Sequence, residues 1–353
     1  MSNPQTLTLR RPDDFHVHLR DGDHLAAALS FTARQFARAV IMPNLKPPVT
    51  TVELADQYRQ RILKALPDTH RFQPLMTLYL TNDTRPDEIR KAKASGFLVG
   101  CKLYPAGATT HSDAGVTAIE HIYPALEAMQ EVGLVLQVHG EVTHGDVDVF
   151  DRETVFIEQV LTPLAERFPT LKIVFEHVTT RTAVQFVQQA RAGIAATITP
   201  QHLLHNRNAI FQGGIRPHYY CLPILKREAD RQALLAAATS DNSRFFLGTD
   251  SAPHAQHTKE NDCGCAGMFS AHAALEMYAE AFEQAGRLDR LEAFASERGA
   301  DFYGLPRNTT NVVLERVNWT PPARYEYGKD HLVPMRAGET LHWRFRDAPQ
   351  GDE

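Results

Sequence analysis

The stretch DDFHVHL, residues 13–19, has the composition of a short β-strand and carries two histidines one residue apart. Side chains alternate between the two faces of a strand, so His16 and His18 point to one face while Phe15 and Val17 point to the other. Two neighbouring imidazoles suit a metal ion and suit an apolar core badly. The stretch therefore predicts a strand that carries part of a metal site.

Seven further short runs follow, and most are rich in Val, Ile, Leu or Phe and end in proline, glycine or polar residues, as buried parallel strands do. They cover residues 38–43, 72–80, 98–105, 134–141, 171–178, 194–201 and 244–251. Amphipathic, helix-like segments alternate with them at 51–66, 85–96, 116–133, 152–168, 181–193 and 226–239.

Eight strands alternating with helices predict an α/β fold of the TIM type, a (β/α)8 barrel. An open doubly wound sheet is the alternative, and the glycine-rich phosphate loops that would favour it, GxGxxG and GxxxxGK[ST], are absent. We expect one domain over residues 1–353, with the barrel at about 10–300 and a short C-terminal extension at about 301–353. Beyond the eighth run the sequence predicts helices at 269–286 and 289–300, short strands within 304–322 and 332–353, and a frayed tail.

The composition excludes several classes of protein. With 353 residues, 43% hydrophobic and 22% charged, and a net charge of −5, the chain is typical of a soluble globular protein and lacks the basic character of nucleic-acid binders. No apolar run of roughly 18 residues predicts a membrane span, and the N-terminus lacks a signal peptide. We therefore expect a cytoplasmic protein whose four cysteines are reduced thiols; Cys263 and Cys265 match no zinc ribbon.

Polar residues occur where the predicted strands end or, for one lysine, within the fourth run. Any one strand-end histidine is more often structural than a ligand, but active sites of barrels form where several strands end, and here five strands contribute. A buried lysine or aspartate also needs a partner, such as an opposite charge or a metal. The candidate residues are His16, His18, Lys102, His139, His177 and Asp250.

This arrangement resembles the amidohydrolase superfamily, with HxH on the first strand, Lys on the fourth, His on the fifth and sixth and Asp on the eighth. The motifs PDDFHVHLRDGDHL, IMPNLKPPVTT, CKLYPAGATT, VHGEVTH, FEHVTT and FLGTDSAPH look like those of the short, single-function dihydroorotases, over about residues 8–340. The resemblance implies a hydrolase that reversibly cyclises N-carbamoyl-L-aspartate to L-dihydroorotate, the third step of de novo pyrimidine (UMP) biosynthesis.

The resemblance also implies a binuclear zinc centre. Lys102 would react with carbon dioxide to give N6-carboxylysine, an anion whose two oxygens bridge the zinc ions. His16, His18 and Asp250 would bind the first zinc, and His139 and His177 the second. A bridging hydroxide would attack the ring carbonyl, and Asp250 would act as general acid and base. Manganese or cobalt stay open as alternatives to zinc.

Further residues are assigned to the substrate by the same resemblance. Arg20, Asn44 and His254 would bind the substrate's free carboxylate, for which a planar guanidinium is well shaped. Main-chain atoms at Leu222 and Ala266, and the side chain of His139, would also contact substrate. Residues 105–115, PAGATTHSDAG, would form a mobile lid from which Thr109 and Thr110 donate hydrogen bonds; Gly107 stands where relatives often have Asn, and His111 where they sometimes do.

The family suggests a homodimer with no macromolecular partner beyond a second copy. Two alternatives remain open from the sequence. One is another cyclic-amide hydrolase, such as a hydantoinase or allantoinase, which shares the metal ligands and differs at Arg20, Asn44 and His254. The other is a non-catalytic relative that serves as a scaffold, although such proteins usually lack several of the ligands.

Overall fold

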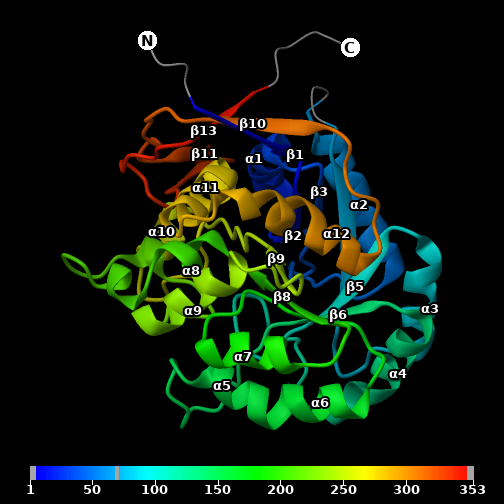
Figure 1. Cartoon of the computed structure of the whole chain (residues 1–353). Helices are drawn as coiled ribbons and strands as arrows, with labels where there is room; N and C mark the ends of the chain where they lie inside the picture. Colours follow the sequence, from blue (N-terminus) through cyan, green and yellow to red (C-terminus); the bar gives the residue numbers. More distant parts are fainter. Residues whose placement is uncertain (1–4, 68–70, 348–353) are drawn as a thin grey trace.

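The structure is a computed structural model that describes residues 5–67 and 71–347. Its centre is one sheet of eight parallel strands in sequential order, surrounded by helices (Figure 1). The strands are β2 (Asp13–Val17), β3 (Arg38–Ile41), β4 (Gln73–Tyr79), β5 (Leu98–Leu103), β6 (Val135–Val138), β7 (Ile173–Phe175), β8 (Ile194–Ile198) and β9 (Phe245–Leu247). Each lies within one of the eight predicted runs, and nearly all their residues are buried, which explains why their sequences are continuously apolar.

The first and last strands meet and close the sheet into a barrel. The backbone N–H of Asp250 donates to the carbonyl of His16 at 2.9 Å, and the N–H of His18 donates to the carbonyl of Ser251 at 3.0 Å. Just below, the carboxylate of Asp14 accepts from the N–H of Thr249 at 2.9 Å and from its hydroxyl at 2.6 Å. The predicted (β/α)8 barrel is therefore confirmed, and the open sheet is excluded.

The helices that follow the barrel strands agree with the predicted segments, except that the first, at Leu25–Gln35, and the short one at Pro200–Leu204 were not predicted. They are α1 (Leu25–Gln35), α2 (Val52–Ala65), α3 (Pro86–Ser95), α4 (Tyr123–Val132), α5 (Arg152–Phe156), α6 (Thr162–Arg167), α7 (Arg181–Gln189), α8 (Pro200–Leu204) and α9 (Glu228–Ala238). The segment predicted as one helix at 152–168 contains a π-helical turn, η3 (Ile157–Leu161), between α5 and α6. Left-handed Gly96 and Gly133 end α3 and α4, as their positions in the sequence indicate.

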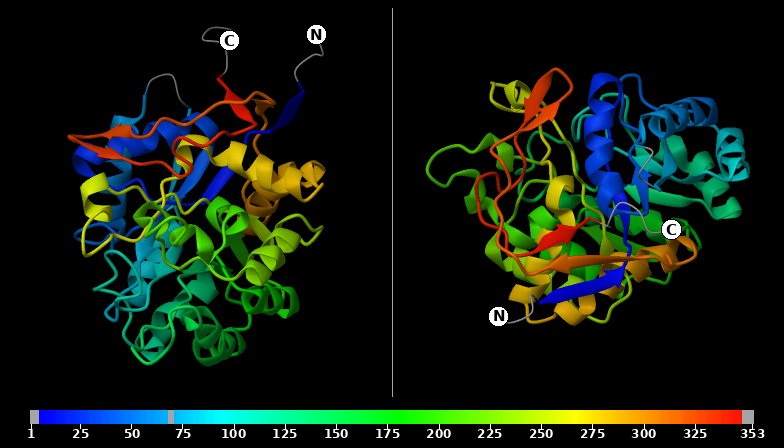
Figure 2. Two further views of the ribbon diagram at one scale, coloured as in Figure 1. Left: turned by 90° about the vertical axis from the view of Figure 1, so that its left-hand side faces the viewer. Right: turned by 90° about the horizontal axis from the view of Figure 1, so that it is seen from above.

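Beyond β9 the chain adds helices and a small second sheet. The helices are α10 (Gln256–Lys259), α11 (Ala274–Gln284) and α12 (Arg298–Tyr303). The strand β10 (Asn311–Glu315) pairs on one side with β13 (Arg344–Arg346) and on the other with an N-terminal strand, β1 (Thr6–Arg10), which was not predicted. Viewed from above, these three strands lie side by side (Figure 2). Because β1 leads directly into β2, this sheet lies where the barrel strands begin.

A two-stranded hairpin, β11 (Tyr325–Tyr327) with β12 (Asp330–Leu332), completes the C-terminal part and was not predicted either. Its Tyr327 stacks on His24 with ring centroids 4.1 Å apart. Most of the predicted frayed tail, at 348–353, lies outside the described residues. All four cysteines are free thiols. Across residues 5–67 and 71–347, no helix has the length and apolar composition needed to cross a bilayer.

Candidate active site

Three potential ligand atoms from the two ends of the barrel sheet converge at its carboxyl-terminal mouth. Nε2 of His16 lies 3.3 Å from Nε2 of His18, and Oδ1 of Asp250 lies 3.3 Å and 3.2 Å from these two nitrogens. All three side chains are buried. Ligand atoms about 2.1 Å from one tetrahedral zinc ion would lie about 3.4 Å from each other, so this triangle fits three ligands of a single metal.

Local backbone features place these three side chains. The carboxylate of Asp14 also accepts from the N–H of His16 at 3.1 Å, which fixes the end of β2 against the end of β9. A side chain at Gly248 would put a Cβ 2.8 Å from Cβ of Thr197 and 3.2 Å from Cβ of His16, so glycine is required for β9 to approach this closely. Nδ1 of His18 lies 2.9 Å from Oδ1 of Asn44, which leaves Nε2 of that ring to face the triangle.

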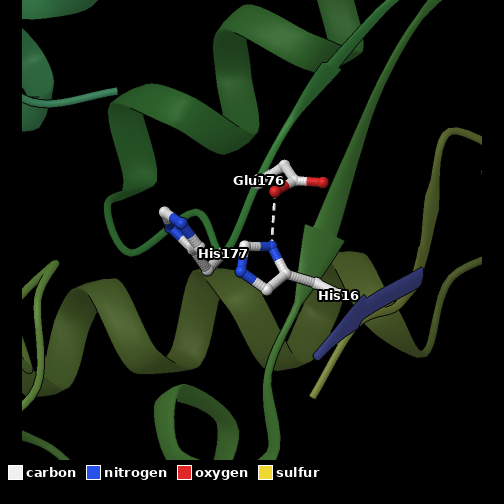
Figure 3. A group of neighbouring side chains, drawn as sticks. All are labelled: His16, Glu176 and His177. Carbon is white, nitrogen blue, oxygen red and sulfur yellow. Dashed lines mark ion pairs between the residues drawn. The ribbon is translucent and has the colours of Figure 1, made fainter. Parts of the chain in front are cut away.

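A second set of groups lies deeper in the mouth, around Glu176. One oxygen of its carboxylate is in close ion-pair contact with both Nζ of Lys102 and Nδ1 of His16. Figure 3 shows this carboxylate directed at the His16 ring, with the ring of His177 next to it. Lys102 and Glu176 are fully buried, so each charge has its partner within the barrel.

The two remaining histidines stand beside His16. The ring centroids of His16 and His177 are 4.9 Å apart, as are those of His177 and His139. Within the described part of the chain, Nδ1 of His177 is buried and has no hydrogen-bond partner. Nε2 of His139 lies 2.8 Å from a carboxylate oxygen of Glu141, which leaves Nδ1 as the nitrogen available to a metal.

These donor groups therefore fit divalent metal ions. In each of two sets of three side chains, the ligand atoms lie within 4.8 Å of one another. One set is His16, His18 and Asp250, and the other is His16, Glu176 and His177. Imidazoles and carboxylates together suit zinc, manganese or cobalt. Of the six residues predicted as ligands, the structure brings His16, His18 and Asp250 into direct contact and puts Lys102 and His177 beside them. The Nε2 atom of His139 is held by Glu141 instead.

Burial and neighbouring charges together set the protonation of this site. Burial alone would raise the pKa of Asp250, but the neighbouring His16 and His18 hold it well below its usual range. Burial lowers the pKa of His18 to about 4 and, together with Lys102, takes the pKa of His177 well below its ordinary value. Burial also lowers the pKa of Lys102 against the opposing effect of Glu176. Asp250 is thus ionised while His18 and His177 are neutral, which are the forms that bind metals.

A small cavity opens from the triangle, and most of the residues predicted to contact substrate line it. Arg20, Asn44, Thr109, Thr110, His139, Leu222 and Ala266 line it together with the predicted ligands His16, His18, His177 and Asp250. His254 stands behind Arg20, with its Nε2 3.0 Å from Nη2 of Arg20 and 2.9 Å from the carbonyl oxygen of Ala266. The polar groups therefore surround one small space beside Asp250.

The loop predicted as a lid lies over this cavity. The side-chain amide of Asn44 donates to the carbonyl of Thr110 at 3.1 Å, and the hydroxyl of Thr110 donates to the carbonyl of Ala266 at 3.3 Å. Inside the loop, the N–H of Thr109 donates to the hydroxyl of the fully buried Ser112 at 2.9 Å. His111 adds a contact of 3.2 Å between its Nδ1 and the carbonyl of Asn44. These bonds describe a closed loop.

Two carboxylates of the site were missed by the sequence reasoning. Glu141 could have been found, because it follows His139 by two residues and so shares its face if the chain stays extended. Glu176 precedes His177 directly, and strand alternation predicts that neighbours point apart. The backbone at His177 has a φ of +42°, outside strand geometry, which allows both side chains to enter the mouth.

Comparisons with known proteins agree with this geometry. Residues 14–312 match a model described as the amidohydrolase family. The chain is 66% identical over 342 residues to a dihydroorotase of Cupriavidus pinatubonensis, covering 97% of this chain and 99% of that one. A crystal structure of dihydroorotase from Campylobacter jejuni matches with a TM-score of 0.90 and 38% identity, over 98% and 99% of the two chains. Dihydroorotase from Saccharomyces cerevisiae, in complex with 5-fluoroorotic acid, matches with a TM-score of 0.88 and 34% identity, over 98% and 100%.

Proposed function

The chain belongs to the amidohydrolase family, among its dihydroorotases, and on this basis we propose that it interconverts N-carbamoyl-L-aspartate and L-dihydroorotate. The observation that carries the proposal is the triangle of His16, His18 and Asp250 next to the Arg20–His254 pair. The triangle suits metal-assisted cleavage of an amide, and the pair suits a carboxylate outside the reacting ring. Binding and cleavage of a cyclic amide that carries a carboxylate require both the triangle and the pair.

The residues present fit two divalent ions, and the mixed nitrogen and oxygen donors favour zinc. His16, His18 and Asp250 would hold one ion and His139 and His177 the other, and N6-carboxylated Lys102 would add its oxygens to the site. When bound, such a pair of ions supplies a nucleophilic water of lowered pKa and polarises the ring carbonyl. Lys102 is fully buried beside His16 and His177, and a carbamate would give it the negative charge that those ions require.

Asp250 moves the proton in this proposal. In the hydrolytic direction its carboxylate accepts a proton from the attacking water and delivers it to the ring amide nitrogen as the ring opens. In the cyclisation direction it takes a proton from the ureido nitrogen as that nitrogen attacks the side-chain carboxyl. Its low pKa and its position at the wall of the cavity support this role, because the ionised form must be the resting state.

The substrate is oriented by residues on the other side of the cavity. Arg20, Asn44 and His254 bind its free carboxylate, and main-chain atoms of Leu222 and Ala266 contact the ring. Thr109 and Thr110 donate to the substrate from the lid, in place of the contact that Thr110 makes with Ala266. His139 lines the same cavity and also lies near substrate. Closing the lid excludes bulk water from the reacting atoms.

The cellular setting follows from the same proposal. The reaction belongs to de novo pyrimidine biosynthesis, and we place the protein in the cytoplasm, for which its four free cysteines are suited. We propose that the chain is one domain and works as a homodimer, on the family resemblance. Its partner is then a second copy of the chain, and its ligand is a small molecule.

An assay of carbamoyl-aspartate cyclisation, with and without a chelator, tests the proposal. We expect turnover in both directions, loss of activity on chelation, and recovery on adding zinc, with close to two zinc ions per chain. Calorimetry with 5-fluoroorotate gives an independent measure of binding. Activity on hydantoin exceeding that on dihydroorotate would favour a hydantoinase instead, and a purified protein without metal or turnover would favour a scaffold.

A further inference from the structure

Lys259, at the end of α10, is a buried lysine whose ammonium group donates hydrogen bonds to three main-chain oxygens. Its Nζ donates to the carbonyls of Cys265 and Gly267, both at 2.7 Å, and of Tyr220 at 3.0 Å. The residue is only 4% exposed. Within residues 5–67 and 71–347, it forms no ion pair with a carboxylate. Buried lysines without an acidic partner are rare, so this arrangement calls for a reason.

The three carbonyls belong to the two backbone segments that form one wall of the substrate cavity. Leu222, Ala266 and Gly267 line that cavity. The segments are also tied together directly, because the N–H of Gly267 donates to the carbonyl of Tyr220 at 3.0 Å. Lys259 therefore binds both segments at the point where they meet.

Lys259 also fixes the direction of the peptide groups in this wall. The carbonyls of Cys265 and Gly267 point to the ammonium group, while the carbonyl between them, on Ala266, points to Thr110 of the lid and to His254. At Gly267 the φ of +149° excludes other residues, and an added Cβ would lie 2.7 Å from the carbonyl oxygen of Ala252. The wall thus depends on an unusual backbone conformation at Gly267, which the ammonium group of Lys259 stabilises.

We propose that Lys259 is a positioning residue. It holds in place the main-chain atoms of Leu222 and Ala266 that contact substrate, and with them the carbonyl of Ala266 onto which the lid closes. This inference rests on the proposed dihydroorotase function and deepens it. Lys259 lies behind the wall, without direct contact to substrate, and its removal should weaken substrate binding far more than the chemical step. The effect should reach the lid as well, because Thr110 closes onto the carbonyl of Ala266.

A dependence on pH follows from the same contacts. An ammonium group has three N–H donors for the three carbonyls, whereas a neutral amine has two. Burial lowers the pKa of Lys259 to about 8, against the smaller raising effects of Cys221 and Cys265, and Arg20 lowers it further. Binding of 5-fluoroorotate should therefore be tightest below pH 8 and weaken as the pH rises through about 8.

Two substitutions test the role. Lys259→Met removes all three donors, and Lys259→Gln keeps two without the charge. We expect KM for dihydroorotate and the Kd for 5-fluoroorotate to rise on the order of tenfold in Lys259→Met and less in Lys259→Gln, from the loss of charge-assisted hydrogen bonds. The kcat and the zinc content should stay within about twofold of the wild type, and the pH step near 8 should disappear from both variants.

Lys172 provides a matched control. It is a partly buried lysine that donates to the carbonyl of Phe302 at 2.7 Å, just before β7 begins and so at the other end of the barrel. Lys172→Met should leave KM, Kd and the pH profile unchanged. If Lys259→Met does not fold, Lys259→Gln and the pH dependence of the wild-type Kd for 5-fluoroorotate test the proposal.

The inference is overturned if Kd and KM of the Lys259 variants match the wild type, if kcat falls while KM stays constant, or if the wild-type Kd is flat between pH 7 and 9. A wild-type protein that neither turns over dihydroorotate nor binds 5-fluoroorotate would instead refute the proposed function itself. The two failures are therefore distinguishable.

Discussion

Arg20 and His254 lie in direct contact, with Nη2 of the guanidinium 3.0 Å from Nε2 of the imidazole. Nε of Arg20 also donates to the carbonyl of Pro253 at 3.1 Å, which fixes the plane of the guanidinium. Burial, reinforced by Arg20, holds the pKa of His254 well below its usual range, so the ring is neutral beside the cation. Together they form a rigid wall with a single positive charge, suited to a single carboxylate.

Replacing Arg20 by methionine should therefore affect only substrates that carry the carboxylate. We expect kcat/KM for dihydroorotate to fall about 100-fold, because charged hydrogen bonds to the carboxylate are lost. Hydrolysis of dihydrouracil, the same ring without the carboxylate, should be unchanged when it is measured at high enzyme concentration. Arg61→Met, which removes an exposed arginine paired with Asp21, is the control. An equal loss on both substrates would contradict the assignment.

Asp250→Ala should abolish most of the turnover. Positioned acid–base groups contribute about 10²–10⁴-fold to rates, so kcat in both directions should fall by at least that range. The loss should persist in samples loaded with zinc to the wild-type content, which separates proton transfer from metal binding. Asp241→Ala, at an exposed aspartate paired with Arg290, should retain full activity. Near-normal turnover in the loaded Asp250 variant would refute its role as acid and base.

Glu176→Gln should weaken metal retention. The carboxylate contacts Nδ1 of His16 and so orients that ring, and loss of such a supporting group typically lowers metal affinity about 10–100-fold. Competition with a chromogenic chelator measures this directly, without reliance on activity. Glu166→Gln changes an exposed glutamate on α6 and should retain zinc like the wild type. Equal zinc affinity in the two variants would show that Glu176 has only a structural role.

Glu276, which lies outside the active site, makes the free energy of unfolding depend on pH. This buried carboxyl on α11 accepts from the side-chain amide of Gln35 at 2.9 Å and from the N–H of Phe345 at 3.0 Å. Burial raises its pKa from 4.5 to about 7. Between these two pKa values the carboxyl keeps its proton in the native state and releases it in the unfolded state. The stabilisation that Glu276 contributes is therefore full below pH 4.5 and is lost as the pH rises to about 7.

The expected loss from Glu276 is about 3 kcal/mol across that window, as an upper bound. Urea unfolding at several pH values measures it, and Glu276→Gln should flatten the profile relative to the wild type. Glu326→Gln, at an exposed glutamate of β11, should leave the profile unchanged. Parallel profiles for wild type and Glu276→Gln would contradict a raised pKa at this position.

The barrel was predictable because each of its strands is buried on both faces and is marked locally by apolar residues. The helix α1 lacks such marks, since His24 provides no side-chain cap at its start, and it was missed. The strand β1 was missed for a different reason. Its partner β10 lies about 300 residues away, and pairing at that distance leaves no local pattern in the sequence.

The site shows the same division. His16 and His18 could be predicted from strand alternation alone, and Asp250 from its position at the end of an apolar run. Glu176 was not predictable, because a left-handed backbone at His177 reverses the alternation. Lys259 was not predictable either, since its partners are carbonyl groups, which every residue carries.

Asp14 and Thr249, which join the ends of the barrel sheet, are 235 residues apart in the sequence. The triangle spans the same interval, so a nascent chain emerging from the ribosome has no complete set of donors until its ninth strand has been synthesised. Until then a partial chain carries His16, Glu176 and His177, but not the complete triangle.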